Sequence, residues 1–100
     1  MITLTKENFD DTIAAGKAFV IFGAAWCGYC RLMEPIVEEL EAGYKGDARL
    51  GKVDVDAEKD LSARYDITTL PTCVLFENGA ETDRKIGAQT LEALESMIGD

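Results

Sequence analysis

The sequence predicts an α/β protein in which a central mixed β-sheet carries helices on both faces. Three observations support this class. Runs of β-forming residues alternate with stretches of helical periodicity, the run 18–22 is apolar throughout like a strand buried on both faces, and Asn78-Gly79 marks a hairpin between two strand-like runs. Alternating strands and helices imply parallel pairing, whereas the hairpin must be antiparallel. One hundred residues, 47% of them hydrophobic, suit a single domain over residues 1–100.

The first half of the chain predicts two strands and two helices. A short strand is expected over 2–4, and a helix over about 5–15 follows because Thr5 or Asn8 can cap its start. The buried strand 18–22 then leads into a longer helix, whose apolar residues at helical spacing are Leu32, Ile36, Val37 and Leu40. The acidic residues on its other faces are Glu34, Glu38, Glu39 and Glu41. The last three of these should form a solvated face.

The second half predicts three strands and two helices. Residues 49–55 favour a strand, and a short helix should cover 56–65. The strand 72–76 is rich in β-forming residues, and its hairpin partner should cover 81–86. A last helix over 90–98 presents one apolar face, formed by Leu91, Leu94 and Ile98.

Charge and composition exclude several classes of function. The net charge of −9 argues against nucleic acid and anionic membrane as partners. No segment approaches the roughly 18 consecutive apolar residues of a membrane span, and the first residues lack a signal-peptide pattern, so we expect a cytoplasmic protein. The chain has three cysteines and no histidine. That composition excludes Ser-His and Cys-His catalysis and fits a reactive dithiol in a reducing compartment.

The most informative segment is Trp26-Cys27-Gly28-Tyr29-Cys30, which lies between the apolar strand and the long helix. Two thiols three positions apart can close an intramolecular disulfide and open it again. At a helix N-terminus, unpaired N–H groups and the helix dipole favour the thiolate of Cys27. Half a zinc site is the competing interpretation, but only Cys73 and carboxylates remain as further ligands, so we expect no metal.

Further segments join this motif in resembling one family. Thr69-Leu70-Pro71-Thr72 looks like a cis-proline loop, and other matching segments are Lys52, Asp54-Val55-Asp56, Asn78-Gly79 and Ile86-Gly87-Ala88. Together they resemble the thioredoxin family over nearly the whole chain, with an atypical active site. The resemblance implies a thioredoxin fold and an enzyme, a thiol-disulfide oxidoreductase that reduces protein disulfides. It implies no cofactor beyond the redox-active disulfide of Cys27 and Cys30.

The resemblance also implies roles for individual residues. Cys27 attacks the substrate disulfide, and Cys30, expected to be the more buried, resolves the mixed disulfide. The backbone of Leu70 pairs with the substrate chain as an added strand. The active-site surface that holds this chain is formed by Trp26, Gly28, Tyr29, Leu70, Pro71 and Gly87. The implied partners are disulfide-bearing proteins and a thioredoxin reductase or similar donor, linked to NADPH or ferredoxin. We expect a monomer active in electron transport and cell redox homeostasis.

Four residues keep more than one interpretation. Trp26 flanks the reactive thiols or belongs to the core, and we favour the former. Pro71 is a cis-proline or an ordinary loop proline. Cys73 is expected to be a buried small hydrophobe, although an oxidant that reaches the proline loop would come near it. Lys52 resembles a buried lysine near the dithiol, where structural pairing and tuning of a thiol pKa are equally open.

Tyr29 is the first departure from the family pattern, because most thioredoxins have proline at this place. Its N–H can point toward the Cys27 sulfur and stabilise the thiolate. We therefore expect a reduction potential shifted from the roughly −270 mV of thioredoxin toward the roughly −200 to −230 mV of glutaredoxins.

Ile21 is the second departure, since the family usually has a buried aspartate there that accepts the proton of the second thiol. Deprotonation of Cys30 must then use water, Lys52 or another nearby group, which predicts slow resolution of the mixed disulfide. Gly23, where an aromatic residue is common, and a shortened last helix are smaller changes, expected not to touch the dithiol directly.

Three other functions stay open on the sequence alone. A disulfide isomerase or oxidase would use the same dithiol at a more oxidising potential. A thioredoxin-fold binding module would use the cysteines only for assembly with a partner enzyme. A metal or iron–sulfur site shared across a dimer would take the thiols as ligands.

Overall fold

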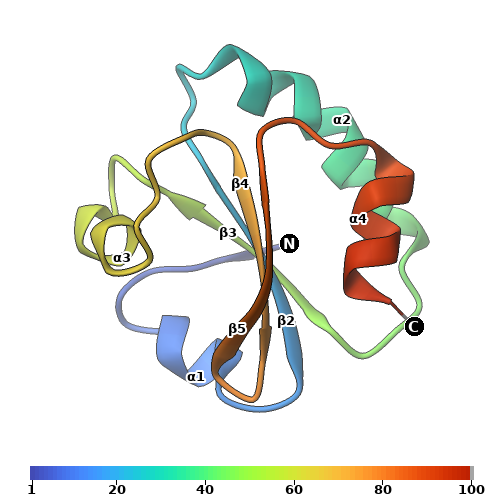
Figure 1. Ribbon diagram of the computed structural model, residues 1–100, viewed down its shortest axis with the longest axis horizontal. Coiled ribbons are helices and arrows are strands. Elements are labelled where there is room, and N and C mark those ends of the chain that lie inside the picture. The colour runs from blue at the N-terminus through green and yellow to red at the C-terminus, as the bar shows by residue number, and fades with distance from the viewer. Residues whose placement is uncertain (100) are drawn as a thin grey trace.

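The computed structural model describes residues 1–99, and its elements follow the predicted order. Along the chain they are β1 (Ile2–Thr3), α1 (Phe9–Ile13), β2 (Lys17–Gly23), α2 (Gly28–Gly43), β3 (Arg49–Asp54), α3 (Lys59–Arg64), β4 (Thr72–Glu77), β5 (Ala80–Ile86) and α4 (Leu91–Ile98). The strands form one sheet in the order β1-β3-β2-β4-β5, with β2 at its centre (Figure 1).

The sheet is mixed, as predicted, but the directions differ in one place. β1, β3 and β2 run parallel, and the hairpin of β4 and β5 is antiparallel. Parallel pairing is wrong for β4, which runs antiparallel to β2. The six residues of α3 rise only about 9 Å along the helix axis, less than the roughly 20 Å length of a six-residue strand. The chain returns to the carboxyl end of β3 after this short helix, and β4 starts there with Thr72 opposite Phe22.

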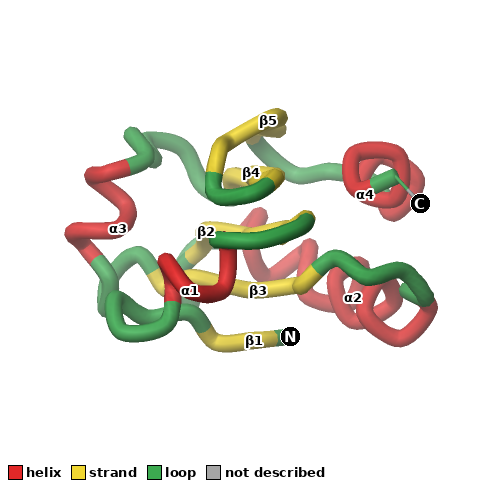
Figure 2. The backbone as a smooth tube through the Cα atoms, turned by 90° about the horizontal axis from the view of Figure 1, so that it is seen from below, coloured by secondary structure: helices red, strands yellow, loops and turns green. Residues whose placement is uncertain are grey.

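Two apolar clusters lie on opposite faces of the sheet. α1 and α3 cover one face, and α2 and α4 cover the other (Figure 2), so helices on both faces are confirmed. Side chains of β2 alternate between the clusters: Val20 and Phe22 enter the first, and Phe19 enters the second. This two-sided burial explains why the strand is apolar throughout.

Two helices have other boundaries than predicted, and in both places a side-chain oxygen accepts a hydrogen bond from a nearby backbone N–H group. α1 is shorter than predicted, and Asn8 Oδ1 accepts the Thr5 N–H at 2.7 Å instead of capping the helix. α3 begins later than predicted, because Asp54 Oδ1 accepts the Asp56 N–H at 2.9 Å and holds a turn there. In the described part of the chain, no helix combines the length and the apolar character needed to cross a membrane.

Phe9 holds α1 against the rest of the protein. Its side chain is fully buried, and its ring packs against those of Phe22, Tyr65 and Phe76, with centroid separations of 6.5, 5.4 and 5.7 Å. These partners come from β2, from the residue after α3 and from β4. One ring thus connects four parts of the fold, and aromatic pairs of this kind add to the burial of apolar area.

Replacing Phe9 with alanine should lower the free energy of unfolding by about 3–5 kcal/mol, because a large buried ring is lost and a cavity remains. Chemical denaturation of the reduced protein measures the change. The control is Leu32→Ala at an exposed position of α2, where a change within about 0.5 kcal/mol is expected. Similar effects of both substitutions would contradict the role assigned to Phe9.

Candidate active site

The dithiol lies where β2 leads into α2, as the sequence predicts. Cys27 has an extended backbone and immediately precedes the first residue of the helix. Its Sγ accepts a hydrogen bond from the Cys30 N–H, with 3.4 Å between sulfur and nitrogen. The sulfur therefore satisfies an N–H group that a serine or aspartate oxygen satisfies at other helix starts. All three cysteines are free in this structure.

Donors around Cys27 lower the pKa of its thiol. The largest cause is the hydrogen bond from the Cys30 thiol, and the backbone N–H of Cys30 comes next. Desolvation opposes these two, and the N–H of Tyr29 adds a smaller lowering. The direction of this last effect is the one predicted for Tyr29, whose N–H a proline would lack. The thiolate, which is the form that attacks disulfides, is thus favoured at Cys27.

The thiol of Cys30 is shifted the other way. Desolvation is the main cause that raises its pKa to about 11, and its hydrogen bond to Cys27 adds to the increase. By residue exposure Cys27, at 7%, is the more buried, and Cys30 is half-buried beside a cavity; desolvation nevertheless acts first on the thiol of Cys30, the one expected to be buried. Gly23 lies on its inner side, where a Cβ would stand 3.1 Å from Cys30 Sγ. A side chain at position 23 would therefore reach the dithiol, so this departure bears on Cys30 directly, contrary to the prediction.

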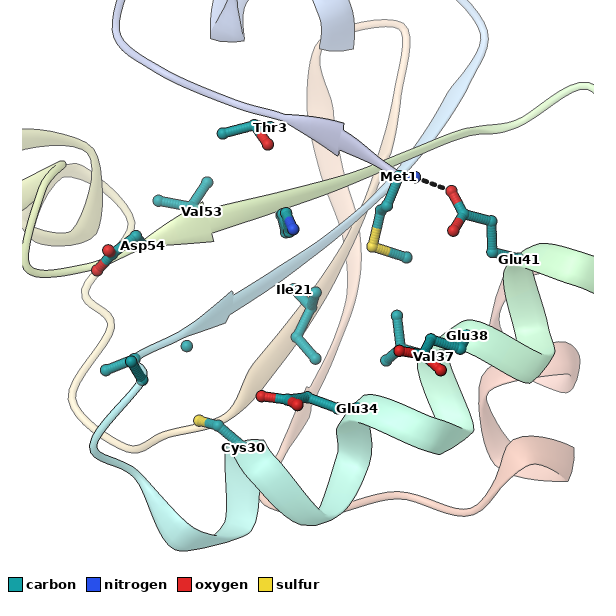
Figure 3. A pocket seen from close by; sticks show the side chains of 14 residues that line it. Met1, Thr3, Ile21, Cys30, Glu34, Val37, Glu38, Glu41, Val53 and Asp54 are labelled. Carbon is teal, nitrogen blue, oxygen red and sulfur yellow. Dashed lines mark ion pairs between the residues drawn. The ribbon is translucent and has the colours of Figure 1, made fainter.

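An open cavity of about 720 Å3 lies between α2 and the strands β1, β3 and β2 (Figure 3). Ile21 and Gly23 line it from β2, and Cys30 lines it from α2. The expectation that Lys52 is buried is wrong, because Lys52 is exposed and lines this cavity from β3, opposite Ile21 in register. Little covers this part of β3, since β1 has only two residues and Gly23 has no side chain.

The loop before β4 brings a second segment to the dithiol. The Leu70–Pro71 peptide bond is cis, as the resemblance implied. The Cys27 thiol donates to the Leu70 carbonyl oxygen at 3.8 Å, and the Gly87 N–H donates to the Pro71 carbonyl oxygen at 2.8 Å. Gly87 has a φ of +91°, a conformation that favours glycine. The structure thus places Leu70, Pro71 and Gly87 next to one another and beside Cys27.

Trp26 and Tyr29 form an exposed apolar rim next to Cys27, with 68% and 64% of their surfaces exposed. Gly28, also exposed, lies between them in the chain. Trp26 therefore flanks the dithiol instead of joining the core. Its indole N–H donates to Asp56 Oδ2 at 2.7 Å, which orients the ring. In the sequence, the only signal for Asp56 is its position within the matching segment 54–56.

Cys73 belongs to the core. It is fully buried in β4, within the apolar cluster beneath α2 and α4. Desolvation raises the pKa of its thiol to about 12. It has the surroundings of a small hydrophobe, as predicted. Among residues 1–99, no group of three or more cysteine, aspartate or glutamate side chains is arranged to hold a metal ion.

These features define a class of protein: a thiol-disulfide oxidoreductase whose dithiol starts a helix and faces a cis-proline loop. Comparison with known proteins identifies the family, because the thioredoxin family model matches residues 1–100. The chain belongs to the thioredoxin family, and its reaction is the reduction of protein disulfides.

Individual relatives agree over nearly the full length. The thioredoxin of Staphylococcus saprophyticus is 37% identical over 98 residues, which are 98% of this chain and 94% of that protein. The thioredoxin of Staphylococcus aureus is 35% identical with the same coverage. Among solved structures, a mutant thioredoxin from Halobacterium salinarum NRC-1 superimposes with a TM-score of 0.87 at 32% identity, covering 97% of this chain and 86% of that one. The thioredoxin fold is thereby confirmed.

Tyr29→Pro should raise the pKa of Cys27, because proline removes one N–H that favours the thiolate. The alkylation rate of Cys27 as a function of pH measures this, since only the thiolate reacts, and its midpoint should move to higher pH. The control is Tyr29→Ala, which removes the ring and keeps the N–H. Equal midpoints for the two variants would show that the N–H does not act on Cys27.

Proposed function

We propose that this protein is a dithiol electron carrier in which Cys27 attacks the substrate disulfide and Cys30 resolves the mixed disulfide. The observation that supports this division of roles is the opposite direction of the two pKa shifts. The pKa of Cys27 is lowered and that of Cys30 is raised to about 11, so Cys27 is the better nucleophile at neutral pH. Cys30 stays protonated until the mixed disulfide forms.

The substrate chain, we propose, lies across the surface formed by Trp26, Gly28, Tyr29, Leu70, Pro71 and Gly87. Two observations support this location. Trp26 and Tyr29 are large apolar side chains exposed beside Cys27, and exposed apolar surface of this kind favours contact with a partner. The Leu70 carbonyl oxygen lies 3.8 Å from Cys27 Sγ, which puts the backbone of this loop within reach of an extended chain bound at the sulfur.

Disulfide-bearing proteins and a reductase are the partners that thioredoxin family membership implies in general. We propose a thioredoxin reductase, linked to NADPH or ferredoxin, as the donor. The redox group is the Cys27–Cys30 disulfide itself, without a bound cofactor. The protein acts as a monomer in the cytoplasm, in electron transport and cell redox homeostasis. The net charge of −9 supports partners with basic surfaces around their disulfides.

Reduction of insulin disulfides with dithiothreitol as donor tests the two thiol roles. Cys27→Ser should reduce the activity to the background rate, because the attacking sulfur is gone. Cys30→Ser, reduced beforehand and freed of dithiothreitol, should still attack but accumulate a covalent adduct with insulin, since no second thiol of the site releases it. The control is Cys73→Ser, which should keep its activity because Cys73 lies in the core.

Two results would contradict the proposal. An adduct that accumulates on Cys30 of the Cys27→Ser variant would reverse the two roles. Full biological function in a variant that has serine at both Cys27 and Cys30 would identify a binding module instead. Replacing dithiothreitol by NADPH-linked and ferredoxin-linked reductases in the same assay identifies the donor.

A further inference from the structure

Resolution requires a proton to leave Cys30, and the structure limits which group can take it. The raised pKa of Cys30, about 11, means that this sulfur is a thiol at neutral pH. Ile21, at the place of the family's usual acid, cannot accept a proton. In the reduced protein the Cys30 thiol donates to Cys27. Once Cys27 is joined to a substrate it carries no charge, so this acceptor is weakened and the thiol needs another.

Glu34 lies on the same helix face as Cys30, one turn further along α2. Residues four positions apart on a helix have their Cβ atoms roughly 5–6 Å apart. Both side chains line the same open cavity. Figure 3 shows the Glu34 carboxylate extending from α2 into this cavity on the side of Cys30. Glu34 is exposed and Cys30 is half-buried, so both side chains border the open cavity.

The other charged groups that line the cavity are less suited to accept this proton. Glu38 lies a further turn from Cys30, and the Glu41 carboxylate is paired with the amino group of Met1. Asp54, on β3, accepts the Asp56 N–H. The remaining charged side chain, on β3, is the cation Lys52.

We propose that Glu34 accepts the proton of Cys30 during resolution, in place of the acid missing at Ile21. In this step the Cys30 sulfur bonds to the Cys27 sulfur while the bond between Cys27 and the substrate sulfur breaks. The substrate leaves as a thiolate with the bonding electron pair. The Cys30 proton passes through cavity solvent to the Glu34 carboxylate and from there to solvent or to the departing thiolate. The inference rests on the proposed resolving role of Cys30.

Stopped-flow reaction of the reduced protein with substoichiometric Ellman's reagent separates attack from resolution. Attack by Cys27 releases the first coloured thiolate, and resolution by Cys30 releases the second. Glu34→Gln should slow the second phase by about tenfold. This is smaller than the roughly 10²-fold effect of a general base that contacts the reacting group directly, because here solvent relays the proton. The first phase should stay within about twofold, since Glu34 takes no part in it.

The matched control is Glu38→Gln, which removes the same charge from the same helix and cavity at a greater distance from Cys30. It should leave the second phase unchanged, and Glu34→Asp should recover part of the rate. In Glu34→Gln the second phase should rise about tenfold per pH unit below the pKa of Cys30, because hydroxide then supplies the base. The unmodified protein should show a shallower dependence.

Two results would overturn the role of Glu34: an unchanged second phase in Glu34→Gln, or equal slowing in Glu34→Gln and Glu38→Gln, which would indicate only a change in the local field. A missing second phase in the unmodified protein would be a different failure, because it would contradict the resolving role of Cys30. The two failures are thus distinguishable in one experiment.

Discussion

The hydrogen bond from the Cys30 N–H to the Cys27 sulfur is the interaction on which the site depends. It joins the first turn of α2 to the sulfur that precedes it, so the fold and the chemistry use the same contact. A helix start leaves N–H groups without partners, and here a sulfur fills the place of a capping oxygen. The pKa of Cys27 is lowered first by the hydrogen bond from the Cys30 thiol and next by this N–H, whereas desolvation is the main cause that raises the pKa of Cys30.

The topology of the sheet brings the rest of the site together, because several strands end or begin near Cys27. β2 ends just before the dithiol, and β4 begins at the cis-proline loop. Gly87, after β5, donates to the Pro71 carbonyl oxygen and holds that loop. The antiparallel direction of β4 is what brings Leu70 to Cys27, since a parallel strand would start at the far end of the sheet. Topology thus determines which backbone a substrate meets beside the reactive sulfur.

Local patterns in the sequence predicted the strand-to-helix junction at Cys27, because an apolar run and a helical period adjoin there. The cis bond at Pro71 came only from the resemblance, since a short loop pattern does not specify an isomer. The sequence patterns did not predict the direction of β4, the exposure of Lys52 or the closeness of position 23 to the Cys30 sulfur. All three depend on packing between distant segments, which no local window contains. In the sequence Glu34 is one of several acidic residues on the polar faces of its helix; it lines the same cavity as Glu38 and differs by lying one turn closer to Cys30.

The central claim is that one helix start gives the two thiols opposite acidities. Titration of the reduced protein by NMR, with isotope-labelled cysteine Cβ atoms, reads both thiols in one sample. The protein should show Cys27 losing its proton below the ordinary thiol pKa and Cys30 titrating at about 11. Two thiols that titrate together near the ordinary value, or Cys30 titrating first, would contradict the claim.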